Sequence, residues 1–186
     1  MHRNILMAAV TVLTLSSLLN ACATVSPNYK TDAANQATLA TFKVSHVAIG
    51  TFTEPNHISS ICRARGPIRP PEGMTYAAFI RNALEQEIRT AGGLASGTPD
   101  ITLTGHLNVI DFSTSFHLVR GYWDLSLELL SSNGQALSVN EHYEFNSGFV
   151  GHIACNRAAK ALPPAVDALI HKIVINKKFS ELLIAK

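Results

Sequence analysis

The turn sequence Ser131-Ser132-Asn133-Gly134 lies between two segments in which apolar and polar residues alternate, and this pattern constrains the fold most strongly. A two-residue Asn-Gly loop would mix apolar and polar residues on one face, because it places two leucines opposite polar residues. A three-residue loop over 132–134, with Gly134 in a left-handed conformation, keeps one face apolar. Its pairs are Leu129 with Leu137, Leu127 with Val139 and Trp123 with Tyr143. The sequence therefore predicts a hairpin with strands at 122–130 and 136–145.

The clearest helix extends over 75–91, where apolar residues recur at spacings of three and four along one face. Thr75 is the predicted N-cap, and Gly92 or Gly93 is expected to end the helix. Arg81, Glu85 and Arg89 lie four residues apart on the opposite side, which predicts an exposed face linked by ion pairs. We interpret the apolar face as core packing.

Other patterns complete the order of elements. Alternating and β-branched residues predict strands at 42–52 and 101–112. Apolar periodicity predicts a helix over 152–175, which Pro163-Pro164 should divide, with a first piece that ends near Ala161. A short helix is expected at 179–184. The resulting α+β domain, 41–186, should consist of an antiparallel four-stranded sheet with two main helices packed on one face, a two-layer sandwich.

Residues 54–74 contain four prolines and two glycines, so they predict a long irregular loop. A loop of this length inside a compact domain is often functional. Arg63, Arg65 and Arg69 give it a local positive charge. One interpretation is a contact with an anionic partner or a lipid headgroup; the other is a solvated loop held in place by Cys62.

The N-terminal segment has a basic start at Arg3 and an apolar run from Ile5 to Leu19, which is typical of a secretory signal rather than a spanning helix. It ends in Leu19-Asn20-Ala21-Cys22. This ending resembles the lipobox of bacterial lipoprotein signals, although Asn20 is larger than usual. The resemblance implies that 1–21 is a signal peptide, and that Cys22 receives a diacylglycerol thioether and becomes the acylated mature N-terminus. The alternative is a plain cleavable signal with an incidental cysteine.

The residue after the cysteine is Ala23, whereas lipoproteins retained at the inner membrane typically carry Asp there, so the resemblance favours sorting to the outer membrane. Residues 22–40 are small, polar and aperiodic, which predicts a flexible tether. Fully extended, it would reach about 55 Å and hold the domain away from the membrane. No second apolar run approaches the roughly 20 residues that a bilayer crossing needs.

The charge balance of the chain argues against a nucleic-acid partner. The formal net charge is +2 for the whole chain, and the segment 1–21 holds Arg3 and no acid, so the mature chain has 2 − 1 = +1. That balance, without a basic stripe interleaved with aromatics, does not predict nucleic-acid binding.

Cys62 and Cys155 remain as an even pair once Cys22 carries lipid. Export would deliver them to an oxidising compartment, where a disulfide persists. The sequence therefore predicts a disulfide between Cys62 and Cys155 that holds the 54–74 loop against the terminal helix. The alternative is two buried free thiols.

Motifs for common chemistries are absent: the sequence contains no G-x-S-x-G, H-E-x-x-H, phosphate-binding glycine loop or C-x-x-C. His106 and His142, placed on adjacent predicted strands, could share a metal, but exposed strand residues explain them better. His152 and Cys155 lie three apart on a helix and form another candidate ligand pair, although a disulfide or core cysteine explains Cys155 better. The sequence predicts no metal site and no cofactor.

The order of elements, including the FIRNALEQEIRTAG helix, resembles that of the YajG-like group of small envelope lipoproteins. The C-R-x-x-G-P-I stretch and the S-S-N-G turn resemble a set of uncharacterised bacterial lipoproteins. These features predict a periplasm-facing lipoprotein of the outer membrane that works as a non-catalytic binding or envelope-assembly accessory, with an envelope protein as partner. A surface-exposed ligand-binding or adhesion lipoprotein is one alternative, and a hydrolase with an unrecognised site is the other.

Overall fold

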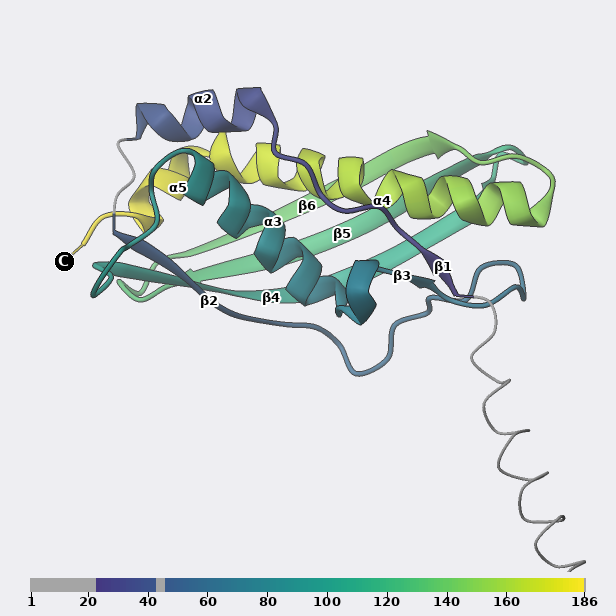
Figure 1. Cartoon of the computed structure of the whole chain (residues 1–186), viewed down its shortest axis with the longest axis horizontal. Coiled ribbons are helices and arrows are strands. Elements are labelled where there is room, and N and C mark those ends of the chain that lie inside the picture. The colour runs from purple at the N-terminus through teal and green to yellow at the C-terminus, as the bar shows by residue number, and fades with distance from the viewer. Residues whose placement is uncertain (1–22, 43–45, 186) are drawn as a thin grey trace, which may run out of the picture.

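The computed structural model describes residues 23–42 and 46–185. The predicted signal peptide 1–21 and the lipidation site Cys22 lie outside these residues. A four-stranded sheet is covered on one face by two long helices, and a third helix lies over them (Figure 1). In chain order the elements are β1 Thr24–Val25, α2 Ala33–Thr41, β2 Val47–Thr53, β3 Ile68–Arg69, the 3-10 helix η2 Pro71–Gly73, α3 Tyr76–Thr90, β4 Ile101–Phe116, β5 Arg120–Ser131, β6 Ala136–Asn146, α4 Gly151–Val174 and α5 Lys177–Leu182.

The sheet has the strand order β2-β4-β5-β6 and is mixed. The pairs β4–β5 and β5–β6 are antiparallel, but β2 runs parallel to β4, with Val47 opposite Ile101. The prediction of a wholly antiparallel sheet is therefore wrong. The reason is α3, which follows β2 and packs on the sheet, so the chain returns to the end where β2 began before it enters β4. Parallel neighbours require a crossover of this kind.

The β5–β6 hairpin has the predicted register. Leu129 lies opposite Leu137, Leu127 opposite Val139 and Trp123 opposite Tyr143. Gly134 has φ +89°, the left-handed conformation that the three-residue loop requires. One face of β5 is consequently buried, and its Trp123 donates its indole Nε1–H to the carbonyl of Ala158 at 2.9 Å.

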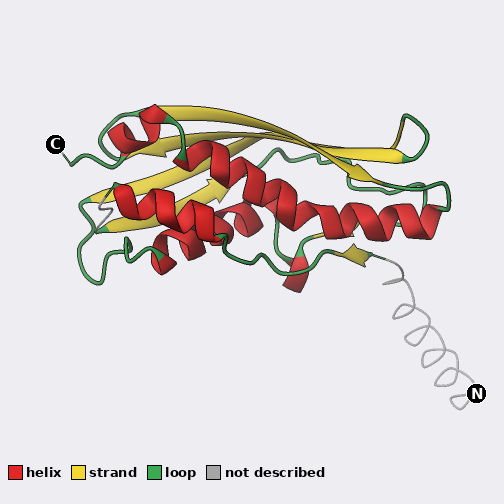
Figure 2. Ribbon diagram, turned by 90° about the horizontal axis from the view of Figure 1, so that it is seen from above, coloured by secondary structure: helices red, strands yellow, loops and turns green. Residues whose placement is uncertain are grey.

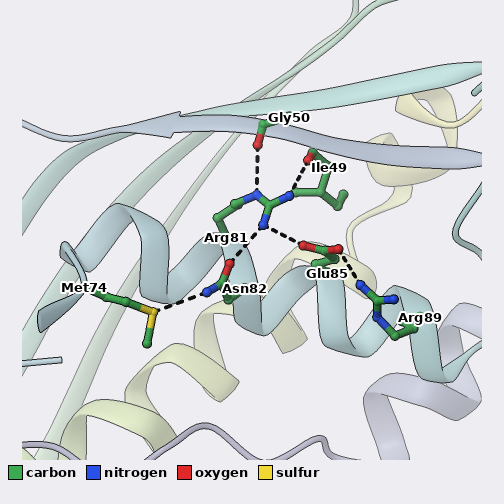
Figure 3. Close-up of polar contacts among 7 residues, drawn as sticks. All are labelled: Ile49, Gly50, Met74, Arg81, Asn82, Glu85 and Arg89. Atoms are coloured by element: carbon green, nitrogen blue, oxygen red, sulfur yellow. Dashed lines mark hydrogen bonds and ion pairs between the residues drawn. The ribbon is translucent and has the colours of Figure 1, made fainter. Parts of the chain in front are cut away.

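The predicted ends of helix α3 and the ion pairs on its outer face are confirmed. Thr75 caps the N-terminus by accepting the amide of Ala78, and Gly92 follows the helix with φ +77°. Glu85 pairs with Arg81 and with Arg89, both at 2.6 Å (Figure 3). Arg81 also donates to the carbonyls of Ile49 and Gly50, so this face ties α3 to β2 as well as meeting solvent.

Helix α4 runs without a break through Pro163 and Pro164, so the prediction of two pieces is wrong. Each proline removes one in-helix amide donor, at a cost of about 3 kcal/mol in a helix interior. On both sides of the prolines the helix buries its apolar face in the core. Six large apolar side chains of α4 are buried, among them Leu162, Val166 and Leu169, and each contributes roughly 1.5–3 kcal/mol. Together they outweigh the roughly 6 kcal/mol that two interior prolines cost.

The segment 23–40 is not a flexible tether but part of the folded domain. Strand β1 pairs with β3, and α2 packs on α3 and α4. Asp32 caps α2 through the amides of Ala34 and Asn35. Leu39 is fully buried, and Tyr29 is 8% exposed. The tether prediction is therefore wrong, because a few side chains in a mostly small and polar segment dock into the surface formed by the two long helices.

Within the described residues, no helix is both long and apolar enough to cross a membrane. The predicted irregular loop 54–74 contains only β3 and η2, and Ile61 forms an isolated bridge with Pro67.

Candidate functional site

Four segments that are distant in the sequence meet at one end of the molecule. They are 23–25, 60–66, 117–119 and 147–156, and we call the surface that they form the apical surface. Figures 1 and 2 show this end where α4 begins, where the β4–β5 hairpin turns and where the chain enters the described domain at Ala23. Backbone bonds connect neighbouring segments: the amide of Thr24 donates to Pro67 at 2.9 Å, and those of Ser147 and Gly148 donate to Val119 at 2.7 and 3.1 Å.

The predicted disulfide between Cys62 and Cys155 is confirmed. The two Cα atoms lie 5.8 Å apart and the sulfur atoms are bonded, within the range that a disulfide requires. Both residues are buried, at 1% and 2% exposure. The bond holds the 60–66 loop against the first turns of α4, which also removes Cys155 as a metal ligand beside His152.

The three arginines proposed as a partner contact have different surroundings. Arg63 bonds to its own chain: its Nε donates to Thr114 Oγ1 at 2.9 Å, one terminal nitrogen donates to the Phe149 carbonyl at 2.7 Å and the other to the Thr114 carbonyl. It therefore joins the loop to β4 and to the segment before α4. Arg65 and Arg69 are exposed. Arg65 lies on the apical surface, whereas Arg69 lines a separate hollow between β3 and α3.

An open hollow of about 700 Å³ lies in the apical surface. Ala23, Arg65, His152 and Asn156 are among the residues that line it. Its position matters because Ala23 directly follows Cys22, the residue that the sequence predicts to carry lipid.

The apical surface also exposes large apolar side chains. Leu118 and Phe149 are each 71% exposed, at the tip of the β4–β5 hairpin and just before α4. Of the eleven exposed large apolar residues in the described part of the chain, seven lie on this surface: Val25, Ile61, Leu118, Val119, Phe149, Val150 and Ile153. Sequence analysis missed this surface because its residues come from four separate segments, and most of them lie outside the predicted strands and helices. The signal was the presence of large apolar residues such as Leu118 and Phe149 between predicted elements.

A second polar cluster lies where the N-terminal segment docks on α3 and α4. The Tyr29 hydroxyl lies 2.6 Å from Glu87 Oε1 and 3.0 Å from Asp167 Oδ1. Glu87 Oε1 also accepts the amide of Asp32 at 2.7 Å, and Asn35 Nδ2 donates to Asp167 Oδ1 at 2.9 Å. The Glu87 side chain is fully buried. The cluster therefore fastens 29–35 to the helices.

Burial raises the pKa of two groups in this cluster. It raises the pKa of Tyr29 far above its ordinary value of 10, and the hydrogen bond to Glu87 adds to that effect. Burial also raises the pKa of Asp167, although Tyr29 and Asn35 oppose the shift by donating hydrogen bonds. A shallow hollow of about 330 Å³, lined in part by Lys160 and Asp167, lies beside the cluster. The two carboxylates accept hydrogen bonds from the docked segment.

The histidines considered as metal ligands lie apart. His106 is on β4 and His142 on β6, and β5 lies between these strands, so the two residues are not on adjacent strands as predicted. His106 contacts Thr53 Oγ1 at 2.7 Å, and His142 contacts Asp124 at 2.5 Å. Among the residues that the structure describes, no three His, Cys, Asp or Glu side chains gather as metal ligands.

The chain matches no protein-family model and no curated protein sequence. Two solved structures have a similar chain path. One is a candidate lipoprotein of Caulobacter crescentus, with a TM-score of 0.42 and 12% identity over 81% of this chain and 96% of that one. The other is a Xanthomonas campestris protein assigned to the family DUF330, with a TM-score of 0.47 and 9% identity over 83% of this chain and 93% of that one. Neither comparison identifies the YajG-like group, so that resemblance stays a prediction.

Proposed function

We propose that this chain is a lipid-anchored lipoprotein of the outer membrane, facing the periplasm, and that it acts there as a non-catalytic binding or envelope-assembly accessory. The observation that carries the proposal is the sequence Leu19-Asn20-Ala21-Cys22, which follows an apolar run and immediately precedes the folded domain. The disulfide between Cys62 and Cys155 supports export, since such bonds persist in oxidising compartments.

The polar groups of the described residues support a binding role rather than a catalytic one. Arg63 and the Tyr29–Glu87–Asp167 cluster form hydrogen bonds within the chain, which join its segments to one another. The apical surface, by contrast, exposes apolar side chains and Arg65, which are suited to contact with another surface. Arg65 keeps the 54–74 loop a candidate partner contact. Arg63 instead holds this loop against β4 and the segment before α4.

The anchor is tested with Cys22→Ser. The variant should lose incorporation of labelled palmitate and should no longer fractionate with membranes. The Cys62→Ala/Cys155→Ala double variant is the matched control, because it removes the other two cysteines and should keep the label. Labelled Cys22→Ser protein in the membrane fraction would refute the proposal.

Sorting and orientation need separate measurements. Ala23→Asp should move the protein from the outer-membrane to the inner-membrane fraction of a density gradient, because Asp after the lipidated cysteine is typical of retained lipoproteins. Protease added to intact cells should leave the protein whole, and protease added after the outer membrane is permeabilised should digest it. Digestion in intact cells would favour the surface-displayed alternative.

A further inference from the structure

We propose that the apical surface rests on the lipid bilayer: Leu118 and Phe149 enter the interface between headgroups and acyl chains, and Arg65 contacts the phosphates of anionic phospholipids. This inference rests on the proposed lipidation of Cys22 and adds an orientation and a second membrane contact to it. The domain would then lie on the membrane by one defined end.

The first argument is the reach of the chain. Thr24 already pairs with Ile68, so only Ala23 separates Cys22 from the folded domain. At about 3.3–3.6 Å per residue, two residues span at most roughly 7 Å. A lipid on Cys22 therefore brings the end of the domain that contains Ala23 to the membrane surface. The docking of 24–41, which the sequence did not predict, is what makes the reach so short.

The second argument is the distribution of apolar surface. Seven of the eleven exposed large apolar side chains in the described residues lie on the apical surface. Exposed apolar side chains gathered at one end of a domain suit an interaction site, and the surface that a lipid on Cys22 would bring nearest to this end is the bilayer. Phe149 and Leu118 are the most exposed of the seven. Partial insertion of such side chains adds to the binding that acyl chains provide.

The third argument is charge. The segments that form the apical surface contain Arg63, Arg65, His117 and His152 and no aspartate or glutamate. Helix α4 continues this trend, since it carries Arg157 and Lys160 before its first acid, Asp167. A surface without acids beside an apolar tip suits anionic headgroups, which attract basic side chains near the membrane.

The fourth argument is the backbone at the hairpin tip. His117 and Leu118 have φ values of +42° and +68°, a region that leucine seldom adopts and that favours glycine, asparagine, aspartate and histidine. The chain thus holds a large apolar residue outward at a position where glycine would be less strained. Residues held in this region of φ cluster at functional sites, so the hairpin tip suits a contact with another surface.

The test uses the full lipidated protein in vesicles of phosphatidylethanolamine and phosphatidylglycerol. The vesicles also contain lipids brominated on the acyl chains, which quench a fluorophore that enters the bilayer. An environment-sensitive fluorophore is attached to a single introduced cysteine in Leu118→Cys or Phe149→Cys. The native cysteines do not react, because Cys22 is a thioether and the other two are bonded to each other. The control is Ile175→Cys, which is 55% exposed at the far end of α4.

Bromolipids should quench the label at 118 and 149 and leave the label at 175 unquenched, and quenching should increase with the fraction of phosphatidylglycerol. Absence of quenching at 118 and 149 in protein that floats with the vesicles overturns the inference. A label at 149 that is shielded from an aqueous quencher but not quenched by bromolipid also overturns it, in favour of a protein partner or a second copy. Failure to float with vesicles instead refutes the lipid anchor itself.

Discussion

Removal of the disulfide between Cys62 and Cys155 should lower the stability of the domain by a predictable amount. The cysteines are 93 residues apart in the sequence, and the loop-closure model gives about 4.7 kcal/mol at 25 °C for a crosslink of this span. That figure is an upper one, because residual structure in the unfolded chain reduces it, and native disulfides typically contribute about 2–4 kcal/mol. For a domain of this size, 1 kcal/mol shifts Tm by about 2–4 °C. We expect a decrease in Tm of about 4–16 °C.

The Cys62→Ala/Cys155→Ala double variant is suited to this measurement. Both sites are at most 2% exposed, so alanine avoids burying the hydroxyl groups that serine would introduce. Thermal unfolding of the purified chain in mild detergent is followed by circular dichroism, with and without a thiol-free reducing agent. Reduction should lower the Tm of the natural chain toward that of the double variant and leave the double variant unchanged.

Two results would refute this reasoning. Mass spectrometry of the unreduced protein should show a two-hydrogen deficit and one crosslinked peptide pair, so two alkylatable thiols in the unreduced, denatured chain would show that the bond is absent. Equal Tm values for the oxidised and reduced chains would show that the bond constrains nothing. Arg63 remains as a second link between the 60–66 loop and the rest of the domain, so reduction should lower the transition without unfolding the loop separately.

Two further changes test the docked N-terminal segment. Leu39→Ala should lower the free energy of unfolding, measured in urea, by about 2–5 kcal/mol, because Leu39 of α2 is fully buried against the long helices. A decrease below about 0.5 kcal/mol would mean that the segment is not docked. Asp167→Asn should flatten the dependence of stability on pH. Burial raises the pKa of Asp167 above 3.8, so its folded form binds a proton more tightly than the unfolded form, and stability falls as pH rises through the folded pKa. Denaturant unfolding between pH 4 and 7 should show this fall in the natural chain and a smaller one in the variant.

Local chemistry explains which parts of the fold the sequence predicted. The register of the β5–β6 hairpin depends on Gly134 and on alternation within ten residues of it. The ends of α3 depend on Thr75 and Gly92. In each case the deciding residues are neighbours in the sequence, so their pattern carries the information. The disulfide was predictable for another reason, since only two cysteines remained to pair.

Competition between distant groups explains the errors. A proline pair argues for a break in α4, but the core packed against both halves of the helix keeps it continuous. The direction of β2 depends on where α3 returns the chain, and alternation within β2 is the same for parallel and antiparallel pairing. The apolar residues of the apical surface come from four segments, and only the fold shows that 60–66, 117–119 and 147–156 lie at one end.

The docked segment 24–41 shows most clearly how such an error changes a functional conclusion. Its small and polar composition is that of a linker, and its binding depends on Glu87 and Asp167, which lie 55 or more residues further along the chain. Glu87 is fully buried, and burying a carboxylate without hydrogen bonds would be costly. Tyr29 and Asp32 both donate to its Oε1, while its Oε2 is buried without a hydrogen-bond partner among the described residues. A free tether would have let the domain move tens of ångströms from its anchor. A docked segment leaves only about two residues between Cys22 and the paired Thr24, so the lipid proposed for Cys22 would determine which end of the domain meets the membrane.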